Sequence, residues 1–456
     1  MAPTPNDFDF DLTKPLTIDE AMQLATGLHR AGHHAEAREV YSRILALVPD
    51  HADALHFMGV LAHDQGREEE ALRLMARSVE LVPDHAGLHS NLGNLHLDNE
   101  RFEDAEREYR QSLSLDPDRP DTLHNLGVLC KAQRRYPEAE RCLRRTIELS
   151  PGFTEARNTL AGLYFKQGRI QEAIGEACQA LIEEPKNAHT REMLGYAYCR
   201  LGRPEEAARL YREWLADEPD NPKALHHLAA CTGESVPTRA SDAYVQNTFD
   251  RFANTFDSRL AVLEYRAPAL VGAAVADCMG EPAADREVLD AGCGTGLCAS
   301  LLKPFARTLT GVDLSSGMLG KARGRQLYDD LQQAELCTYI QQQPGRFDLI
   351  VSADTLVYFG VLDEAIEAAA RALRPGGHLC FTVEALADGE TADYHLQHHG
   401  RYAHSNGYLA RLLDQVGLLT QRLEQVVLRL DAGEPVAGWL VLAQRPDGQL
   451  RADPPN

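Results

Sequence analysis

A glycine-rich turn, VLDAGCGTG at 288–296, lies between two acidic residues with a spacing that suits nucleotide binding. Asp290 stands just before the glycines, and Asp313 ends the next apolar run along the chain. Glycines let the backbone approach a ligand closely, and free amides at a following helix start attract a carboxylate or phosphate. An acid at the end of the second strand accepts hydrogen bonds from ribose hydroxyls. The pattern therefore predicts a nucleotide-type ligand in a βαβ unit.

A dinucleotide loop is the alternative interpretation of this turn. Gly292 and Gly294 begin the pattern GxGxxG, but its third glycine position holds Leu297. Gly296 makes the pattern GxGxG instead, and Asp290 before the glycines is unlike a pyrophosphate loop. The complete pattern, DxGxGxG with a downstream acid, resembles the class I S-adenosylmethionine-dependent methyltransferases.

Two later segments extend this resemblance over some 200 residues. FDLIVSADTLVYFG (347–360) is similar to the family's fourth strand and its following loop, and LRPGGHLCFTVEA (373–385) to its turn into the fifth strand. The order is that of the family. The resemblance implies a Rossmann-like, doubly wound sheet with a terminal antiparallel hairpin from 420–430 and 435–445. It also implies S-adenosylmethionine as the cofactor.

The resemblance assigns cofactor contacts position by position. The glycine turn is expected to hold the methionine portion, Asp313 the ribose, and Leu314 one side of the adenine. Glu335 is the best match for the acid that meets the adenine amino group. Asp354 follows the fourth strand and is expected to face the sulfonium and the acceptor, because ligands collect at the carboxyl ends of such strands. The complete set of expected cofactor contacts is Asp290, Gly292, Gly294, Gly296, Asp313, Leu314, Glu335 and Asp354.

A histidine-rich segment, DYHLQHHGRYAHSNGYL at 393–409, is the candidate acceptor loop. Its phrase GRYAHS resembles one in a subset of methyltransferases fused to tetratricopeptide (TPR) repeats, where it precedes a helix after the fifth strand. Arg401 suits a bidentate contact with a carboxylate. Tyr402 and His404 are expected to orient the acceptor, so these three residues and Asp354 form the candidate catalytic set.

Zinc binding and plain solvation are the alternatives for this loop. His395, His398, His399 and His404 lie close together, but no carboxylate or cysteine ligand pattern joins them. The ten cysteines are scattered singly without a CxxC pair, as expected for reduced thiols in the cytoplasm. We therefore expect no metal site.

The N-terminal half repeats with a period of 34 residues. A proline recurs at each repeat end and a small residue at the eighth position of each of six repeats, where helices must cross closely. The prolines are Pro49, Pro83, Pro117, Pro151, Pro185 and Pro219. The pattern is similar to the TPR family, which implies an α-solenoid over 18–231 with a capping helix at its end.

Polar side chains recur on the first helix of successive repeats. Asn91, Asn94, Asn125 and Asn158 fall at positions that line the concave surface in TPR proteins, and an Asn side chain offers both a donor and an acceptor to a peptide amide. We therefore expect these four residues, with Arg401 and His404, to contact a peptide or protein acceptor. A structural role, or a homodimer formed through the repeats, is the alternative.

The domain boundaries follow from these patterns. An N-terminal extension covers 1–17, the solenoid 18–231, a polar linker 232–245, and the methyltransferase domain 246–456. Near the start of the last domain Phe249, Phe252 and Phe256 fall on one helical face, which is typical either of core packing or of a lid over the cofactor.

The net charge of −22 disfavours nucleic acid and anionic membrane surfaces as partners. Without a long apolar run or a signal-like N-terminus, we expect a cytoplasmic protein. The predicted function is methyl transfer from S-adenosylmethionine to an O or N nucleophile of a peptide or protein recruited by the repeats. The alternatives are a small-molecule methyltransferase that uses the repeats for dimerisation or docking, and a non-catalytic scaffold.

Overall fold

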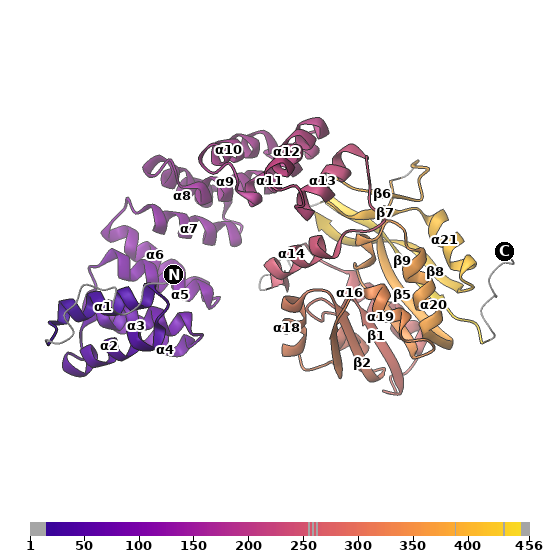
Figure 1. Cartoon of the computed structure of the whole chain (residues 1–456), viewed down its shortest axis with the longest axis horizontal. Helices are drawn as coiled ribbons and strands as arrows, with labels where there is room; N and C mark the ends of the chain where they lie inside the picture. The colour runs from indigo at the N-terminus through magenta and orange to yellow at the C-terminus, as the bar shows by residue number, and fades with distance from the viewer. Residues whose placement is uncertain are drawn as a thin grey trace. The chain divides into compact units, whose positions relative to one another are not determined.

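A computed structural model describes residues 15–447, except 254–255, 258–259, 261–262, 388 and 432–433. Most of the expected N-terminal extension, 1–14, lies outside the described residues. The chain forms two compact units (Figure 1). One contains the chain up to Phe165 together with Gln171–Pro185, and the other contains Lys166–Ile170 together with the chain from Lys186 onward.

The repeat half consists of paired helices, as the 34-residue period predicts. The first helix begins with a capping box, in which the Thr17 and Glu20 side chains each accept a hydrogen bond from the other's backbone N–H. The helices are α1 (Ile18–Arg30), α2 (His34–Leu47), α3 (Ala52–Asp64), α4 (Glu68–Leu81), α5 (Ala86–Asp98), α6 (Phe102–Leu115), α7 (Pro120–Ala132), α8 (Tyr136–Leu149), α9 (Thr154–Lys166), α10 (Ile170–Glu183), α11 (Ala188–Arg200), α12 (Pro204–Asp217) and α13 (Pro222–Thr232).

Small residues set the close crossing of each helix pair. A Cβ atom at Gly93 of α5 would lie 2.7 Å from the ring of Tyr109 on α6, which is fully buried. A Cβ at Gly195 of α11 would lie 2.2 Å from the hydroxyl oxygen of Tyr211 on α12. Larger residues at these positions would force the two helices apart.

The capping helix α13 is packed on two sides. One side joins the cluster of Tyr211 and Trp214 at the end of the repeats, and the other packs Ala229 and Ala230 against Tyr402 of the C-terminal part. The repeat pattern does end near the predicted linker. The packing division instead falls near residue 185, because α11–α13 share a compact unit with the residues that follow them.

The C-terminal part contains one mixed sheet, in agreement with the expected doubly wound fold with a terminal antiparallel hairpin. Parallel strands run in the order β3-β2-β1-β4-β5, and β9 pairs antiparallel with both β5 and β8. The strands are β1 (Arg286–Ala291), β2 (Ala306–Asp313), β3 (Asp330–Gln333), β4 (Phe347–Ser352), β5 (Leu373–Ala385), β6 (Tyr394–Leu396), β7 (Tyr402–His404), β8 (Leu419–Asp431) and β9 (Glu434–Gln444). The terminal hairpin is therefore confirmed.

Helices cover both faces of this sheet, which is the doubly wound arrangement. One apolar core lies between the sheet and α19, α20 and α21, and a second lies between the sheet and α16 and α17. The helices are α14 (Asp242–Phe252), α16 (Ala267–Met279), α17 (Ala299–Leu302), α18 (Ser316–Gly324), α19 (Leu336–Gln341), α20 (Asp363–Ala372) and α21 (Asn406–Gln415), with a 3₁₀ turn η3 (Leu356–Tyr358). In the described part of the chain, no helix has the length and apolar character needed to cross a membrane.

Candidate active site

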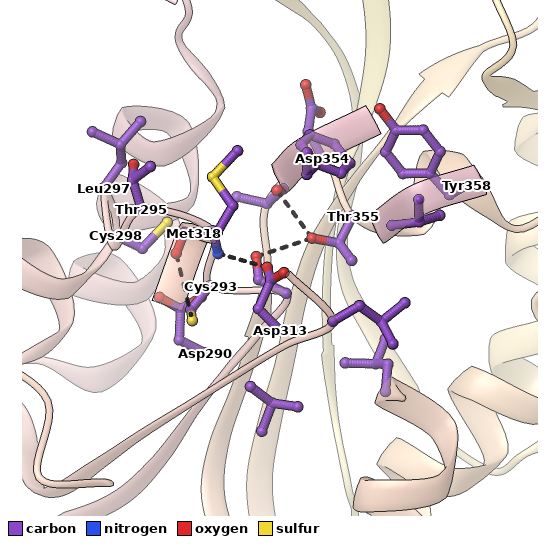
Figure 2. A pocket seen from close by; sticks show the side chains of 18 of the residues that line it. Asp290, Cys293, Thr295, Leu297, Cys298, Asp313, Met318, Asp354, Thr355 and Tyr358 are labelled. Atoms are coloured by element: carbon purple, nitrogen blue, oxygen red, sulfur yellow. Dashed lines mark hydrogen bonds between the residues drawn. The ribbon is translucent and has the colours of Figure 1, made fainter. Parts of the chain in front are cut away.

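A cavity opens at the carboxyl ends of β1, β2 and β4, where a sheet of this topology collects ligands. It encloses about 1190 Å³ including its open mouth. Figure 2 shows Asp290, Asp313 and Thr355 grouped near the turn after β1, with Asp354 and Tyr358 at the other side from Leu297. Of the predicted cofactor contacts, all except Gly296 line this cavity.

The glycine turn owes its shape to a close approach by the loop after β4. Gly292 has a φ of 79°, and a Cβ there would lie 2.1 Å from the Thr355 hydroxyl oxygen. That hydroxyl donates a hydrogen bond to the Gly292 carbonyl over 3.1 Å. Gly296 also has a positive φ, but it lies against Tyr328 and not on the cavity. Its role is thus to let Tyr328 pack behind the turn.

Asp313 ends β2 with both carboxylate oxygens held by backbone donors. The Gly294 N–H donates to Oδ2 over 2.9 Å, and the Ser315 N–H donates to Oδ1 over 2.8 Å. Each oxygen keeps a second lone pair, so both can still accept from a vicinal diol. Burial raises the pKa of Asp313 above its ordinary value, while these N–H groups lower it. The arrangement fits the ribose of S-adenosylmethionine.

Asp290 is buried behind the turn beside an unexpected partner. The Tyr328 hydroxyl donates to its Oδ2 over 2.6 Å, and only 1% of the residue is exposed. Burial raises the pKa of Asp290 to about 7, although the hydrogen bond from Tyr328 opposes the shift. The carboxyl group therefore changes protonation near neutral pH and supports the turn from the protein side.

The adenine end of the cavity is formed where β3 leads into α19. Glu335 is the N-cap of α19 and accepts hydrogen bonds from the backbone N–H groups of Cys337 and Thr338. Burial raises the pKa of Glu335, but these hydrogen-bond donors lower it more. The pKa therefore lies below its ordinary value, and the carboxylate is ionised at neutral pH. Leu314 lines the same region. This pairing of an acid with an apolar side chain fits a purine with an exocyclic amine.

Two of the three predicted lid aromatics cover the cavity. Phe249 and Phe256 line it, with ring centroids 5.8 Å apart, and Phe249 also meets Tyr358 edge-on at 5.5 Å. Phe252 does not line it. The segment is anchored by Asp250, which accepts a hydrogen bond from the Gly317 N–H at the start of α18. These rings exclude water from one side of the cavity.

A buried group of charges forms the end of the cavity opposite the cofactor turn. Asp354 follows β4 with a φ of 54° and is held by the Thr382 hydroxyl, which donates to its Oδ1 over 3.0 Å. Arg429 of β8 donates to Asp354 Oδ2 over 3.2 Å and also to Glu384 at the end of β5. Arg401 reaches the same Glu384 oxygen over 3.4 Å.

The charges in this group balance. Burial would raise the pKa of Glu384, but His399, Arg401 and Arg429 together lower it below its ordinary value. Burial raises the pKa of Asp354 despite the two arginines. Burial also lowers the pKa of His399 to about 4, so this ring is neutral at pH 7. Two guanidinium groups therefore face two carboxyl groups, and both arginines also line the cavity.

The other residues of the histidine-rich loop do not line this cavity. The Tyr402 hydroxyl donates to the Pro237 carbonyl over 2.7 Å, and His404 Nε2 donates to the Gly360 carbonyl over 3.1 Å. Both side chains are fully buried, and burial lowers the pKa of His404 to about 4. The structure thus places these two residues beneath the loop that presents Arg401, away from the position expected for acceptor contacts.

Two of the four predicted groove asparagines hydrogen-bond to each other across successive repeats, and a third pairs with a histidine of the preceding repeat. Asn125 donates to the Asn94 side-chain oxygen over 2.8 Å, and Asn91 pairs with His56 at 3.0 Å. Tyr109 also donates to Asn94 over 2.9 Å. Asn91 is exposed, while Asn94, Asn125 and Asn158 are half-buried. The first helices of the repeats thus carry a row of polar side chains, the polar strip, formed by Asn91, Asn94, Asn125 and Asn158.

Sequence patterns did not reveal Arg429, Tyr328 or Glu384 as site residues. Arg429 lies in the run VVLRL, a pattern that predicts only a hairpin strand. Yet Arg429 is only 4% exposed. A charged residue inside an apolar strand is a usable signal, because an unpaired buried charge is costly. Glu384, in the apolar run LCFTVEAL, carries the same signal, whereas Tyr328 offers none.

Family models agree with both halves of the chain. Residues 263–421 match a methyltransferase domain model. Tetratricopeptide repeat models match 84–151, 124–189, and the pair 28–95 and 166–231. The chain thus carries TPR repeats and a methyltransferase domain, and the predicted fold class is confirmed.

Curated relatives match the C-terminal half. The chain is 36% identical over 141 residues to methyltransferase-like protein 27 of Homo sapiens, covering 30% of this chain and 56% of the relative. It is 35% identical over 104 residues to a ubiquinone biosynthesis O-methyltransferase of Idiomarina loihiensis (22% and 42% covered). It is 38% identical over 96 residues to a malonyl-[acyl-carrier protein] O-methyltransferase of Enterobacter lignolyticus (21% and 38% covered). The chain spans about half the length, or less, of these relatives.

Solved structures with similarity to the chain include TPR proteins. Pseudomonas aeruginosa pilF aligns with a TM-score of 0.42 and 17% identity, covering 46% of this chain and 96% of that one. YrrB, described as a TPR protein with an unusual peptide-binding site, aligns with a TM-score of 0.36 and 21% identity, covering 41% of this chain and 97% of that one.

The methyltransferase domain and its relatives imply S-adenosylmethionine as the cofactor, as the sequence predicted.

Proposed function

We propose that this chain, with its TPR repeats and methyltransferase domain, transfers a methyl group from S-adenosylmethionine to an O or N nucleophile of a peptide or protein. The observation that carries the proposal is the cavity itself. It joins a glycine turn and the Asp313 carboxylate at one side to two buried arginines at the other. The same cavity is therefore lined both by the residues assigned to the cofactor and by those assigned to the acceptor.

Bound S-adenosylmethionine supplies a sulfonium-activated methyl group. The protein therefore needs mainly to align an acceptor with that group and to exclude water. Phe249 and Phe256 exclude water, and the Asp313 and Glu335 carboxylates hold the two ends of the nucleoside. Arg401 interacts with Glu384 at 3.4 Å and with Tyr358, and a guanidinium with five N–H donors can make further hydrogen bonds in the cavity. We assign it to the acceptor.

The arginines favour an acceptor that carries a carboxylate. Such a group arrives ionised, needs no general base, and forms charge-assisted hydrogen bonds with a guanidinium. The absence of a histidine from the residues described around the cavity agrees with base-free chemistry. Malonyl-[acyl-carrier protein] O-methyltransferases, among the relatives, are named for a protein-borne substrate.

The polar strip on the repeats is our candidate for acceptor recruitment. Asn125 donates to Asn94 over 2.8 Å, and Asn91 pairs with His56 at 3.0 Å while it remains exposed, so these side chains can exchange partners with a peptide backbone at little cost. Tight holding of sequence-variable peptides requires such donors and acceptors at regular spacing.

A small-molecule acceptor is the second candidate. The Phe249, Phe256 and Tyr358 rings that line the cavity suit a flat apolar compound. In that case the repeats would dock or dimerise the enzyme, and the cavity alone would select the substrate.

Calorimetry with S-adenosylhomocysteine tests the cofactor assignment. Asp313→Ala should weaken binding by about 1–3 kcal/mol, because two hydrogen bonds to the ribose are lost. Asp277→Ala changes an exposed aspartate on α16 and is the matched control. Unchanged affinity in Asp313→Ala, or tighter binding of NAD by the parent chain, would contradict the assignment.

Methyl transfer to a pool of synthetic peptides tests recruitment. Asn91→Ala combined with Asn125→Ala should raise KM several-fold, by about 1 kcal/mol of lost binding, and leave cofactor affinity unchanged. Gln111→Ala, on the second helix of its repeat, is the control. Equal KM values in all three proteins would instead support the docking role and a small-molecule acceptor.

A further inference from the structure

Three metal-ligating side chains meet where α11, α13 and the histidine-rich loop come together. Cys199 lies near the end of α11, Cys231 near the end of α13, and His398 in the loop between β6 and β7. Their potential ligand atoms all lie within 4.8 Å of one another, and the two sulfur atoms are 3.2 Å apart. None of the three lines the cavity of the active site.

The fold brings these side chains together through contacts that involve no metal ion. Tyr211 and Trp214 pack with Cys199 in the cluster that joins the last repeat helices to α13. The loop is then fixed to α13, because His226 Nε2 donates to the Gly400 carbonyl over 2.8 Å. The three ligands therefore meet without any ion.

We propose that Cys199, Cys231 and His398 bind one zinc ion, with water at the fourth coordination position. Thiolate sulfur and imidazole nitrogen are the ligands that zinc prefers. Three such protein ligands and one water molecule complete its four-coordinate geometry. Within the described residues no fourth Cys, His, Asp or Glu joins the group.

The two sulfur atoms need only a small adjustment to bind one zinc ion. Zinc–sulfur bonds of about 2.3 Å place two thiolates about 3.8 Å apart on a tetrahedral ion. The sulfur atoms must therefore separate by about 0.6 Å from their 3.2 Å contact. Cys199 is buried while His398 is exposed, so the ion can enter from the loop side.

The hydrogen bonding of His398 favours the same role. Its Nδ1 lies 3.1 Å from the Ala230 carbonyl oxygen, which can only accept, so Nδ1 carries the proton. Nε2 then keeps the lone pair that a metal requires. Metal-binding histidines commonly donate their second nitrogen to a carbonyl or carboxylate, which fixes the ring.

This proposal differs from the expectation of no metal in the histidine-rich loop. That expectation considered the loop histidines alone, whereas only His398 takes part here and the cysteines come from two repeat helices. A bound ion would fix the loop that presents Arg401 to the last repeat. The acceptor side of the cavity would then depend on the repeats even without a peptide in the groove.

Metal analysis of the full-length protein tests the proposal. The parent chain, purified under reducing conditions and given Zn²⁺, should retain about one zinc per chain after desalting. Cys231→Ser and His398→Ala should retain almost none. Cys278→Ser changes a half-buried cysteine of the same compact unit and should behave as the parent does.

Cobalt substitution keeps the test valid if Cys231→Ser folds poorly. Co²⁺ in the parent should give sulfur-to-cobalt absorption that His398→Ala, a change at an exposed residue, alters or abolishes. Retention of both zinc and the cobalt spectrum by His398→Ala would overturn the proposal. So would a parent chain without zinc affinity whose intact mass shows the loss of two hydrogens, because the cysteines would then form a disulfide.

Discussion

The two ends of the active-site cavity are built in different ways. At the cofactor end, a single turn and the strand beside it supply the contacts, and backbone N–H groups hold the Asp313 carboxylate. At the acceptor end, side chains from β4, β5, β8 and the loop before β7 form one buried charge group. One end thus depends on local backbone shape and the other on the assembly of the whole sheet.

This difference teaches which substitutions each end tolerates. The glycine turn at the cofactor end should lose its ligand when a side chain is added, because the space beside Gly292 is already filled by Thr355. A charge group fails when a side chain is removed, because the remaining partner is left buried and unpaired. The following predictions test this contrast, starting with the largest effect.

Adding a methyl group to the turn should abolish cofactor binding. Gly292→Ala would place a Cβ 2.1 Å from the Thr355 hydroxyl oxygen at a φ of 79°. We expect S-adenosylhomocysteine affinity to fall by about 100-fold or more, because the turn must open. Calorimetry measures this, with Gly320→Ala on α18 as the control, since nothing lies within 4 Å of a Cβ there. Near-parent affinity in Gly292→Ala would break the contrast.

Removing a charge at the acceptor end should spare the cofactor. Arg401→Ala is expected to lower kcat/KM by about 100-fold and to change S-adenosylhomocysteine affinity by less than about twofold, because its contact forms with the acceptor. Arg401→Lys should recover part of the loss. Arg411→Ala, an exposed arginine paired with Asp393, serves as the control. Equal losses of cofactor affinity and turnover would show that the two ends are not separable.

The last prediction concerns stability rather than ligand binding. Because the folded pKa of Asp290 is raised to about 7, its ionisation opposes folding, and this penalty grows as pH rises from about 4 to 7. Asp290→Asn removes the cost of ionising a buried carboxyl group, but it weakens the hydrogen bond that the Tyr328 hydroxyl donates. Relative to the parent, we expect the variant to gain about 3 kcal/mol between pH 4.5 and 8, because a pKa shift of one unit corresponds to about 1.4 kcal/mol. Thermal melts at several pH values measure it, and a constant difference would contradict the raised pKa.

Local patterns predicted the parts of the molecule that are locally determined. The glycine turn and Asp313 follow from spacing within a strand and a turn, and Gly292, Gly294 and Asp313 line one cavity. The doubly wound sheet and the terminal hairpin came with the resemblance. None of these inferences required knowing which distant segments meet.

The parts that escaped prediction depend on such distant meetings. Arg429 joins Asp354 and Glu384 from a strand that appears only structural in sequence, and Tyr328 supports Asp290 from the far side of β2. Tyr402 and His404 lie close to Arg401 in sequence, yet they point elsewhere because β7 turns them into the core. Residues that are close in the sequence can therefore have side chains that point in different directions.

The capping helix α13 has a consequence for how such a protein can change over generations. Both of its long sides are already used, one by Trp214 and the other by Tyr402. A duplicated repeat inserted after α13 would have to strip one of these contacts, whereas a duplication among the earlier helices would preserve both. Lineages that lengthen or shorten this array should therefore do so upstream, and the final repeat should be the slowest to vary.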